Sequence, residues 1–149
     1  MGSRKHITAT ARKEANKELY FAKLNNCPSS PRKMRLVANM IRGKNVHEAL
    51  YILQHMPHYA AGKLYKLVKS ALANWQVKNE GVRMEDSNLY ISEIRVDQGA
   101  TLKRIKPAPH GRAHRIRKRS NHVTVFIDSR NIDAVENEIV ETETKTDKE

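Results

Sequence analysis

The sequence has few of the residues that crosslink a protein or anchor it in a membrane. Cys27 is the single cysteine among 149 residues, so no disulfide within the chain and no cysteine-based zinc site can form. No apolar run approaches the ~20 residues of a bilayer-spanning helix. The first eighteen residues alternate polar and basic side chains and lack the apolar segment of a signal peptide. We therefore expect one cytoplasmic domain and no membrane partner.

Residues in catalytic or metal-binding patterns are also missing. Of the seven histidines, His55 and His58 are separated by Pro57 and have no carboxylate or thiol at ligand spacing. His47-Glu48 lacks the second histidine of a zincin helix. The sequence contains no phosphate-cradling glycine loop, nucleophile elbow or paired carboxylates. We predict that the chain is not an enzyme and has no catalytic residue, metal site or cofactor.

What the chain has in excess is positive charge, and this charge is unevenly distributed. Lysine and arginine number 28 against 16 acidic residues, a net charge of +12. Residues 131–149 hold seven acids and two bases, or −5, which leaves +17 for residues 1–130. A small domain with this charge repels itself, and a polyanion would relieve the repulsion. Nucleic acid is the first candidate and an anionic membrane surface the second.

Hydrophobic patterning predicts a mixed set of helices and strands. We expect strands at residues 19–24, 89–97 and 123–127. The alternation slips between Ile91 and Ile94, which indicates either a bulge or two partly buried faces. Helices are expected from Ser30-Pro31 to Arg42, from Asn45 to Met56, and from Ala60 through Trp75. Ser30 and Asn45 are candidate N-caps, and Trp75 is expected in the core rather than as a base-stacking platform. Residues 1–18 look like a loose basic arm and 131–149 like a disordered acidic tail.

The segment most informative about function lies between the last two strands. Residues 98–127 contain no acid, and two strands with a Pro/Gly-rich turn between them predict a hairpin with its apex at 107–111. Each arm of about ten residues would reach roughly 30 Å. The segment carries eight bases: Lys103, Arg104, Lys106, Arg112, Arg115, Arg117, Lys118 and Arg119.

This hairpin has too few apolar residues to build a core of its own. The main ones are Leu102, Ile105 and Ile116. The arginine guanidinium matches phosphate oxygens in two-point contacts, so the composition favours a phosphate-rich partner. Two alternatives are a solvated, flexible basic loop and a nuclear-localisation signal at residues 115–119.

A second basic cluster surrounds the first predicted helix. The helix start also combines free backbone amides with the positive end of the helix dipole, which attracts anions. The alternative is an ordinary charged helix face. The members of this cluster are Arg32, Lys33, Arg35, Arg42 and Lys44.

A set of short motifs follows one another along the chain. They are Ser30-Pro31-Arg32-Lys33-Met34-Arg35-Leu36-Val37-Ala38, Ile41-Arg42-Gly43-Lys44, Glu48-Ala49-Leu50, Lys69-Ser70-Ala71-Leu72-Ala73-Asn74, Ile94-Arg95-Val96-Asp97-Gln98-Gly99, Lys103-Arg104, Gly111-Arg112-Ala113, Arg115-Ile116, Lys118-Arg119 and His122-Val123-Thr124-Val125. In this collinear order, from about Leu19 to Asp128, the chain resembles the family of large-ribosomal-subunit protein twenty-two.

The resemblance implies an α+β fold with three helices packed on a small antiparallel sheet and a long extended β-hairpin. It implies one ribosomal-protein domain at 19–130, with the hairpin at about 98–122. It also implies a structural constituent of the ribosome that binds large-subunit rRNA and supports assembly as a single copy among neighbouring ribosomal proteins. The rRNA-binding residues would be the two basic clusters together with Arg95. The hairpin tip would line the nascent-peptide exit tunnel through Pro107, Ala108, Pro109, His110 and Gly111.

The residues alone leave other classes of protein open. A free-standing architectural or regulatory nucleic-acid binder could use the hairpin to read a groove. An RNA-processing enzyme is a more distant possibility, for which the sequence offers no catalytic group.

Overall fold

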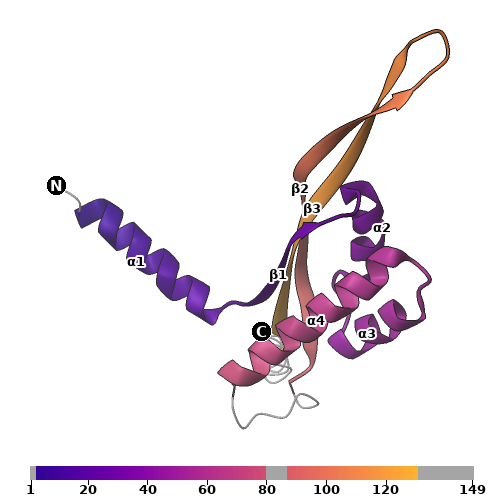
Figure 1. Cartoon of the computed structure of the whole chain (residues 1–149). Coiled ribbons are helices and arrows are strands. Elements are labelled where there is room, and N and C mark those ends of the chain that lie inside the picture. Colours follow the sequence, from indigo (N-terminus) through magenta and orange to yellow (C-terminus); the bar gives the residue numbers. More distant parts are fainter. Residues whose placement is uncertain (1–2, 80–86, 131–149) are drawn as a thin grey trace, which may run out of the picture.

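Four helices and three strands make up the described part of the chain, residues 3–79 and 87–130 of a computed structural model (Figure 1). The sheet is antiparallel, with order β1-β3-β2, so the last strand of the sequence lies in the middle. In chain order the elements are α1 (Ser3–Glu18), β1 (Tyr20–Cys27), α2 (Pro31–Ile41), α3 (Val46–His55), α4 (Tyr59–Lys78), β2 (Leu89–Pro107) and β3 (Ala113–Ser129).

One face of the sheet is covered by helices, which accounts for the alternating pattern of β3. Val123, Val125 and Ile127 are buried, while the residues between them are only half-buried on the opposite face. α4 packs against β1 and β3, α2 against β2, and α3 against α4. The predicted α+β class is therefore confirmed, and α2, α3 and α4 are the three helices expected around the sheet.

The helix boundaries agree with the sequence, but not all of the predicted caps form. Ser30 precedes α2, but its side chain accepts no capping hydrogen bond from the helix amides, so its expected capping role is wrong, although Pro31 takes the first position. Asn45 does cap α3, where its Oδ1 accepts from the His47 amide at 3.0 Å. Glu48 forms an ion pair with Lys44. The helix starts are thus set by Pro31 and Asn45.

The long helix α4 confirms the clearest periodicity in the sequence. Its residues Leu64, Val68 and Ala71 are completely buried, and Trp75 is 3% exposed. The Trp75 ring meets the Tyr20 ring edge-on, with centroids 6.4 Å apart. Trp75 is thus a core residue, as expected, and not a stacking platform for bases.

The N-terminal segment differs from the expected loose arm, because residues 3–18 form helix α1. The segment contains no glycine or proline and is rich in alanine, lysine, arginine and glutamate, all of which favour helix. It lacks the apolar stripe by which the other helices are recognised, so its pattern did not predict a helix. α1 projects away from the sheet (Figure 1). The predicted acidic tail, 131–149, lies outside the described residues.

Candidate nucleic-acid interface

The basic segment forms an extended hairpin, as the sequence predicts. β2 and β3 remain paired from Leu89 and Ser129 to Pro107 and Ala113 at the far end. The ribbon continues well beyond the helices that cover the sheet (Figure 1). Side chains at positions 102–107 and 109–119 are all exposed. The hairpin therefore presents both of its faces to whatever surrounds it.

Two irregularities in the ladder shape this hairpin. The first, between Ile91 and Glu93, is the bulge expected from the sequence. The second lies between Gln98 and Thr101 and was not predicted. At Gly99 a Cβ atom would lie 2.7 Å from Ser120 Oγ, too close for any other residue without a shift. Glycine therefore avoids displacing the Ser120 side chain where the hairpin leaves the body.

The turn lies where the Pro/Gly cluster placed it. The Ala108 amide donates to the Arg112 carbonyl at 2.8 Å and closes the tip. His110 and Gly111 have φ angles of 59° and 67°, a left-handed pair that reverses the chain. Glycine suits the second of these positions because it has no Cβ.

The register distributes positive charge over both faces of the ribbon. Lys103 lies directly opposite Arg117, and such a like-charge pair destabilises a free hairpin. Because side chains alternate along a strand, this face also holds Arg115 and Arg119, whereas Arg104, Lys106 and Lys118 lie on the other. This arrangement suits a partner that surrounds the ribbon with negative charge.

None of the eight hairpin bases has a carboxylate partner within residues 3–79 and 87–130. Their only described side-chain hydrogen bond joins Arg104 Nη1 to the carbonyl of Lys103, at 3.0 Å. A cation that is neither buried nor paired retains its full capacity to bind an anion. The hairpin charge is therefore available to an external partner.

Four other predicted site residues have partners within the fold. Arg35 donates through Nε and Nη2 to the Val96 carbonyl, at 3.2 and 2.8 Å. Arg42 donates to the Ile94 carbonyl at 3.1 Å. These two arginines fasten α2 to β2. The remaining pair, Lys44 and Arg95, forms ion pairs with glutamates.

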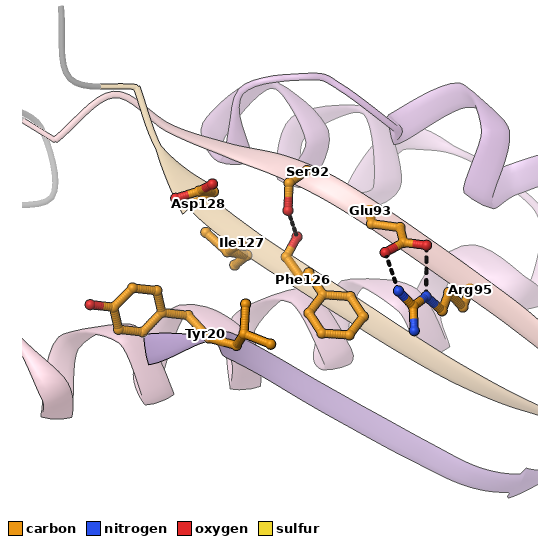
Figure 2. A pocket seen from close by; sticks show the side chains of 8 residues that line it. Tyr20, Ser92, Glu93, Arg95, Phe126, Ile127 and Asp128 are labelled. Atoms are coloured by element: carbon orange, nitrogen blue, oxygen red, sulfur yellow. Dashed lines mark hydrogen bonds and ion pairs between the residues drawn. The ribbon is translucent and has the colours of Figure 1, made fainter. Parts of the chain in front are cut away.

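Arg95 lies on the uncovered face of the sheet, beside a recess of about 260 Å³ (Figure 2). It donates from Nε to Glu93 Oε1 at 2.6 Å and also stacks over the Phe126 ring, 5.0 Å from the centroid. The hydrogen bond from Arg95 lowers the pKa of Glu93 below its ordinary value. Arg95 is thus already neutralised, in contrast with the hairpin bases.

The hairpin root lies beside the segment that leads into α2, which sequence reasoning did not predict. A groove of about 730 Å³ is lined by Ser29 and Ser30 before α2 and by Arg117 and Arg119 of β3, among others. Buried Asn121 joins the two segments, because its Nδ2 donates to the Ser29 carbonyl at 2.7 Å. The sequence separation of 92 between these partners explains why no local pattern reveals the groove.

Other kinds of site find no support in the described residues. Across positions 3–79 and 87–130, histidine, cysteine and acidic side chains form no group of three that could hold a metal ion. No helix in this part of the chain is long and apolar enough to cross a bilayer. Burial raises the pKa of the Cys27 thiol, with an opposing contribution from Lys63, so this cysteine is poorly suited to act as a nucleophile.

Comparison with known proteins gives matches over nearly the whole chain. The family described as "Ribosomal protein L22p/L17e" matches residues 22–128. The Large ribosomal subunit protein uL22 of Flavobacterium psychrophilum is 61% identical over 131 residues, which cover 88% of this chain and 96% of the relative. The protein of that name from Flavobacterium johnsoniae is 59% identical, with 88% and 96% covered. The one from Porphyromonas gingivalis is 56% identical, with 89% and 98% covered.

These matches span the sheet, the three packed helices and the complete hairpin. They also agree with the resemblance carried by the motifs of α2 and of β2 and β3. The chain therefore belongs to the uL22 family of large-ribosomal-subunit proteins, which are structural constituents of the ribosome and not enzymes.

Proposed function

We propose that this ribosomal protein binds large-subunit rRNA through its hairpin and the adjoining start of α2. In this proposal the hairpin bases and the exposed Arg32 and Lys33 contact phosphates directly. Arg35 and Arg42 contribute chiefly by fixing α2 against β2. Lys44 and Arg95 are already paired with glutamates and contribute less to phosphate binding than the hairpin bases. Binding would support subunit assembly by holding distant rRNA segments on one rigid protein.

The observation that supports this proposal is the unpaired charge of the hairpin. Eight exposed bases on a two-stranded ribbon repel one another and have no carboxylate partner among the described residues. Phosphates would neutralise them and release counterions, which favours binding. Three of these bases, Arg117, Lys118 and Arg119, line the groove beside the segment that leads into α2, so an RNA strand in the groove would meet positive charge at the hairpin root.

The family resemblance further implies that the hairpin tip, residues 107–111, lines the nascent-peptide exit tunnel. The shape of the tip is compatible with this role, since the ribbon is narrow and its turn has no large apolar side chain. Neighbouring ribosomal proteins, a nascent peptide and a cytoplasmic location belong to the same proposal, with one copy of the chain per subunit.

Sedimentation of the chain with ribosomes tests the proposal. Tagged parent and variant chains would be produced in Flavobacterium johnsoniae, whose own protein is 59% identical. We expect the parent to co-sediment with the large subunit and the Arg112→Ala/Arg115→Ala variant to be depleted there. The matched control, Lys66→Ala/Lys69→Ala, removes the same charge from exposed positions of α4 and should incorporate normally.

Equal incorporation of the hairpin variant and its control would contradict the role of the hairpin. A parent chain found mainly in a pool away from ribosomes would instead favour the free-standing nucleic-acid binder.

A further inference from the structure

Helix α1 is a part of the molecule that the hairpin's function leaves unexplained. It is held at its C-terminal end, where Lys78 Nζ of α4 donates to the carbonyls of Lys17 and Leu19 at 2.7 and 2.9 Å. The same ammonium lies over the Tyr20 ring, 5.1 Å from its centroid. A cation bound to the last carbonyls of a helix also complements the helix dipole. The root of α1 is thus fixed on the body.

Beyond this root, α1 lacks the support that helices usually receive. No helix or strand of the described chain packs substantially against it. An isolated helix of sixteen residues is only marginally stable in water. Ile7 is its one large apolar side chain and is 62% exposed, so α1 has no stripe for a protein groove or a bilayer surface. The partner that stabilises α1 must therefore be polar.

The charges of α1 indicate which polar partner it fits. The helix carries five bases and two acids. Arg4, Lys5 and Arg12 lie around one shallow recess of about 340 Å³, together with Thr8 and Ala9. At 3.6 residues per turn, Ile7 and Glu14 lie on the far side. This face, which we call the α1 basic face, spans roughly 12 Å from Arg4 to Arg12 and contains no acid.

We propose that α1 is a second RNA-binding element, whose basic face docks on the phosphates of an rRNA segment separate from the one that the hairpin contacts. The two elements leave the body in different directions (Figure 1), so one continuous strand need not serve both. The inference rests on the proposed rRNA-binding function and extends it to a second site. Docking also supplies the stabilisation that the isolated helix lacks, because phosphates neutralise its mutually repelling bases.

Crosslinking from two matched positions tests this inference. Thr8 lies on the α1 basic face, and Thr10 lies about 200° around the helix from it. Both hydroxyls donate to backbone carbonyls of the preceding turn, Thr8 to Arg4 at 2.9 Å and Thr10 to His6 at 3.0 Å, so replacing either costs the helix the same kind of contact. Thr8→Cys and Thr10→Cys chains would each carry a benzophenone maleimide and be assembled into large subunits. Cys27 is 3% exposed and does not compete for the label.

We expect the Thr8 probe to crosslink rRNA several-fold more than the Thr10 probe. Equal yields from the two positions, or crosslinks only to protein, would overturn the inference. A third probe at Ala113→Cys on the hairpin separates the two claims. An rRNA crosslink from Ala113 without one from Thr8 would refute the role of α1 alone. The absence of both would refute the proposed function as well.

A charge-matched pair of variants gives an independent measurement. Arg4→Gln/Arg12→Gln removes two of the three charges of the α1 basic face, whereas Lys13→Gln/Lys17→Gln removes the same charge from other sides of the helix. We expect the arginine variant to leave the large subunit at a lower salt concentration than the lysine variant. Release of both at the same salt concentration would show that α1 acts through its net charge and has no docking face.

Discussion

Replacing two hairpin arginines should flatten the salt dependence of RNA binding by a predictable amount. The perturbation is Arg112→Ala/Arg115→Ala, which removes two of the eight exposed hairpin bases. Each phosphate contact contributes about −0.7 to −0.9 to the slope of log K against log salt concentration. Eight contacts would therefore contribute roughly −6 to −7, and the double variant should lose about 1.5 of this slope.

This change corresponds to a ratio of affinities that can be measured directly. As salt rises from about 50 to 200 mM, the ratio of the parent's association constant for RNA to that of the variant should fall about eightfold. Fluorescence anisotropy with large-subunit rRNA, titrated at several salt concentrations, gives both slopes. Lys66→Ala/Lys69→Ala is the control and should keep the parent slope. An unchanged slope in the arginine variant would refute the assignment of these side chains to phosphate contacts.

Three further predictions concern the scaffold that holds the interface. Met34→Ala should lower the free energy of unfolding by about 2–5 kcal/mol in urea titrations, because Met34 is fully buried, while Met40→Ala at a 52% exposed position should change it little. Gly99→Ala should lower the free energy of unfolding by about 1–3 kcal/mol, because the new Cβ would meet Ser120 Oγ. Adding Ser120→Gly should restore part of this stability. An unchanged free energy of unfolding in Gly99→Ala would contradict the close approach. In the parent, the lowered pKa of Glu93 gives a small stabilisation that is present above the ordinary carboxyl pKa and is lost as pH falls through the lowered pKa of the folded state. Glu93→Gln should remove this stabilisation. Unfolding midpoints measured across acidic pH would detect the difference.

The sequence predicted the parts of the fold that follow from local patterning. The periodicity of α4 placed Trp75 in the core, and the broken alternation after Ile91 indicated a bulge as one of two interpretations. The Pro/Gly cluster located the turn of the hairpin. These features could be predicted because each depends on residues close together in the chain.

Features that depend on distant residues could not be predicted in this way. Arg35 bonds to the Val96 carbonyl, 61 residues away, so its structural role was invisible in a run of bases that resembles a binding cluster. The groove between Ser29 and Arg117 likewise forms only after the strands pair. α1 was missed for another reason, because helix propensity without an apolar stripe does not produce the usual signal.

The central claim is that the hairpin lies among phosphates, and directed cleavage from its surface tests this most directly. An iron chelate attached at Ala113→Cys, in assembled large subunits, releases hydroxyl radicals that cut nearby nucleic-acid backbone. Parent chains treated with the same reagent, whose single Cys27 is buried, provide the background. The account predicts strong, localised cleavage of large-subunit rRNA from the Ala113 probe. Cleavage no greater than the background, in subunits that contain the labelled chain, would contradict it.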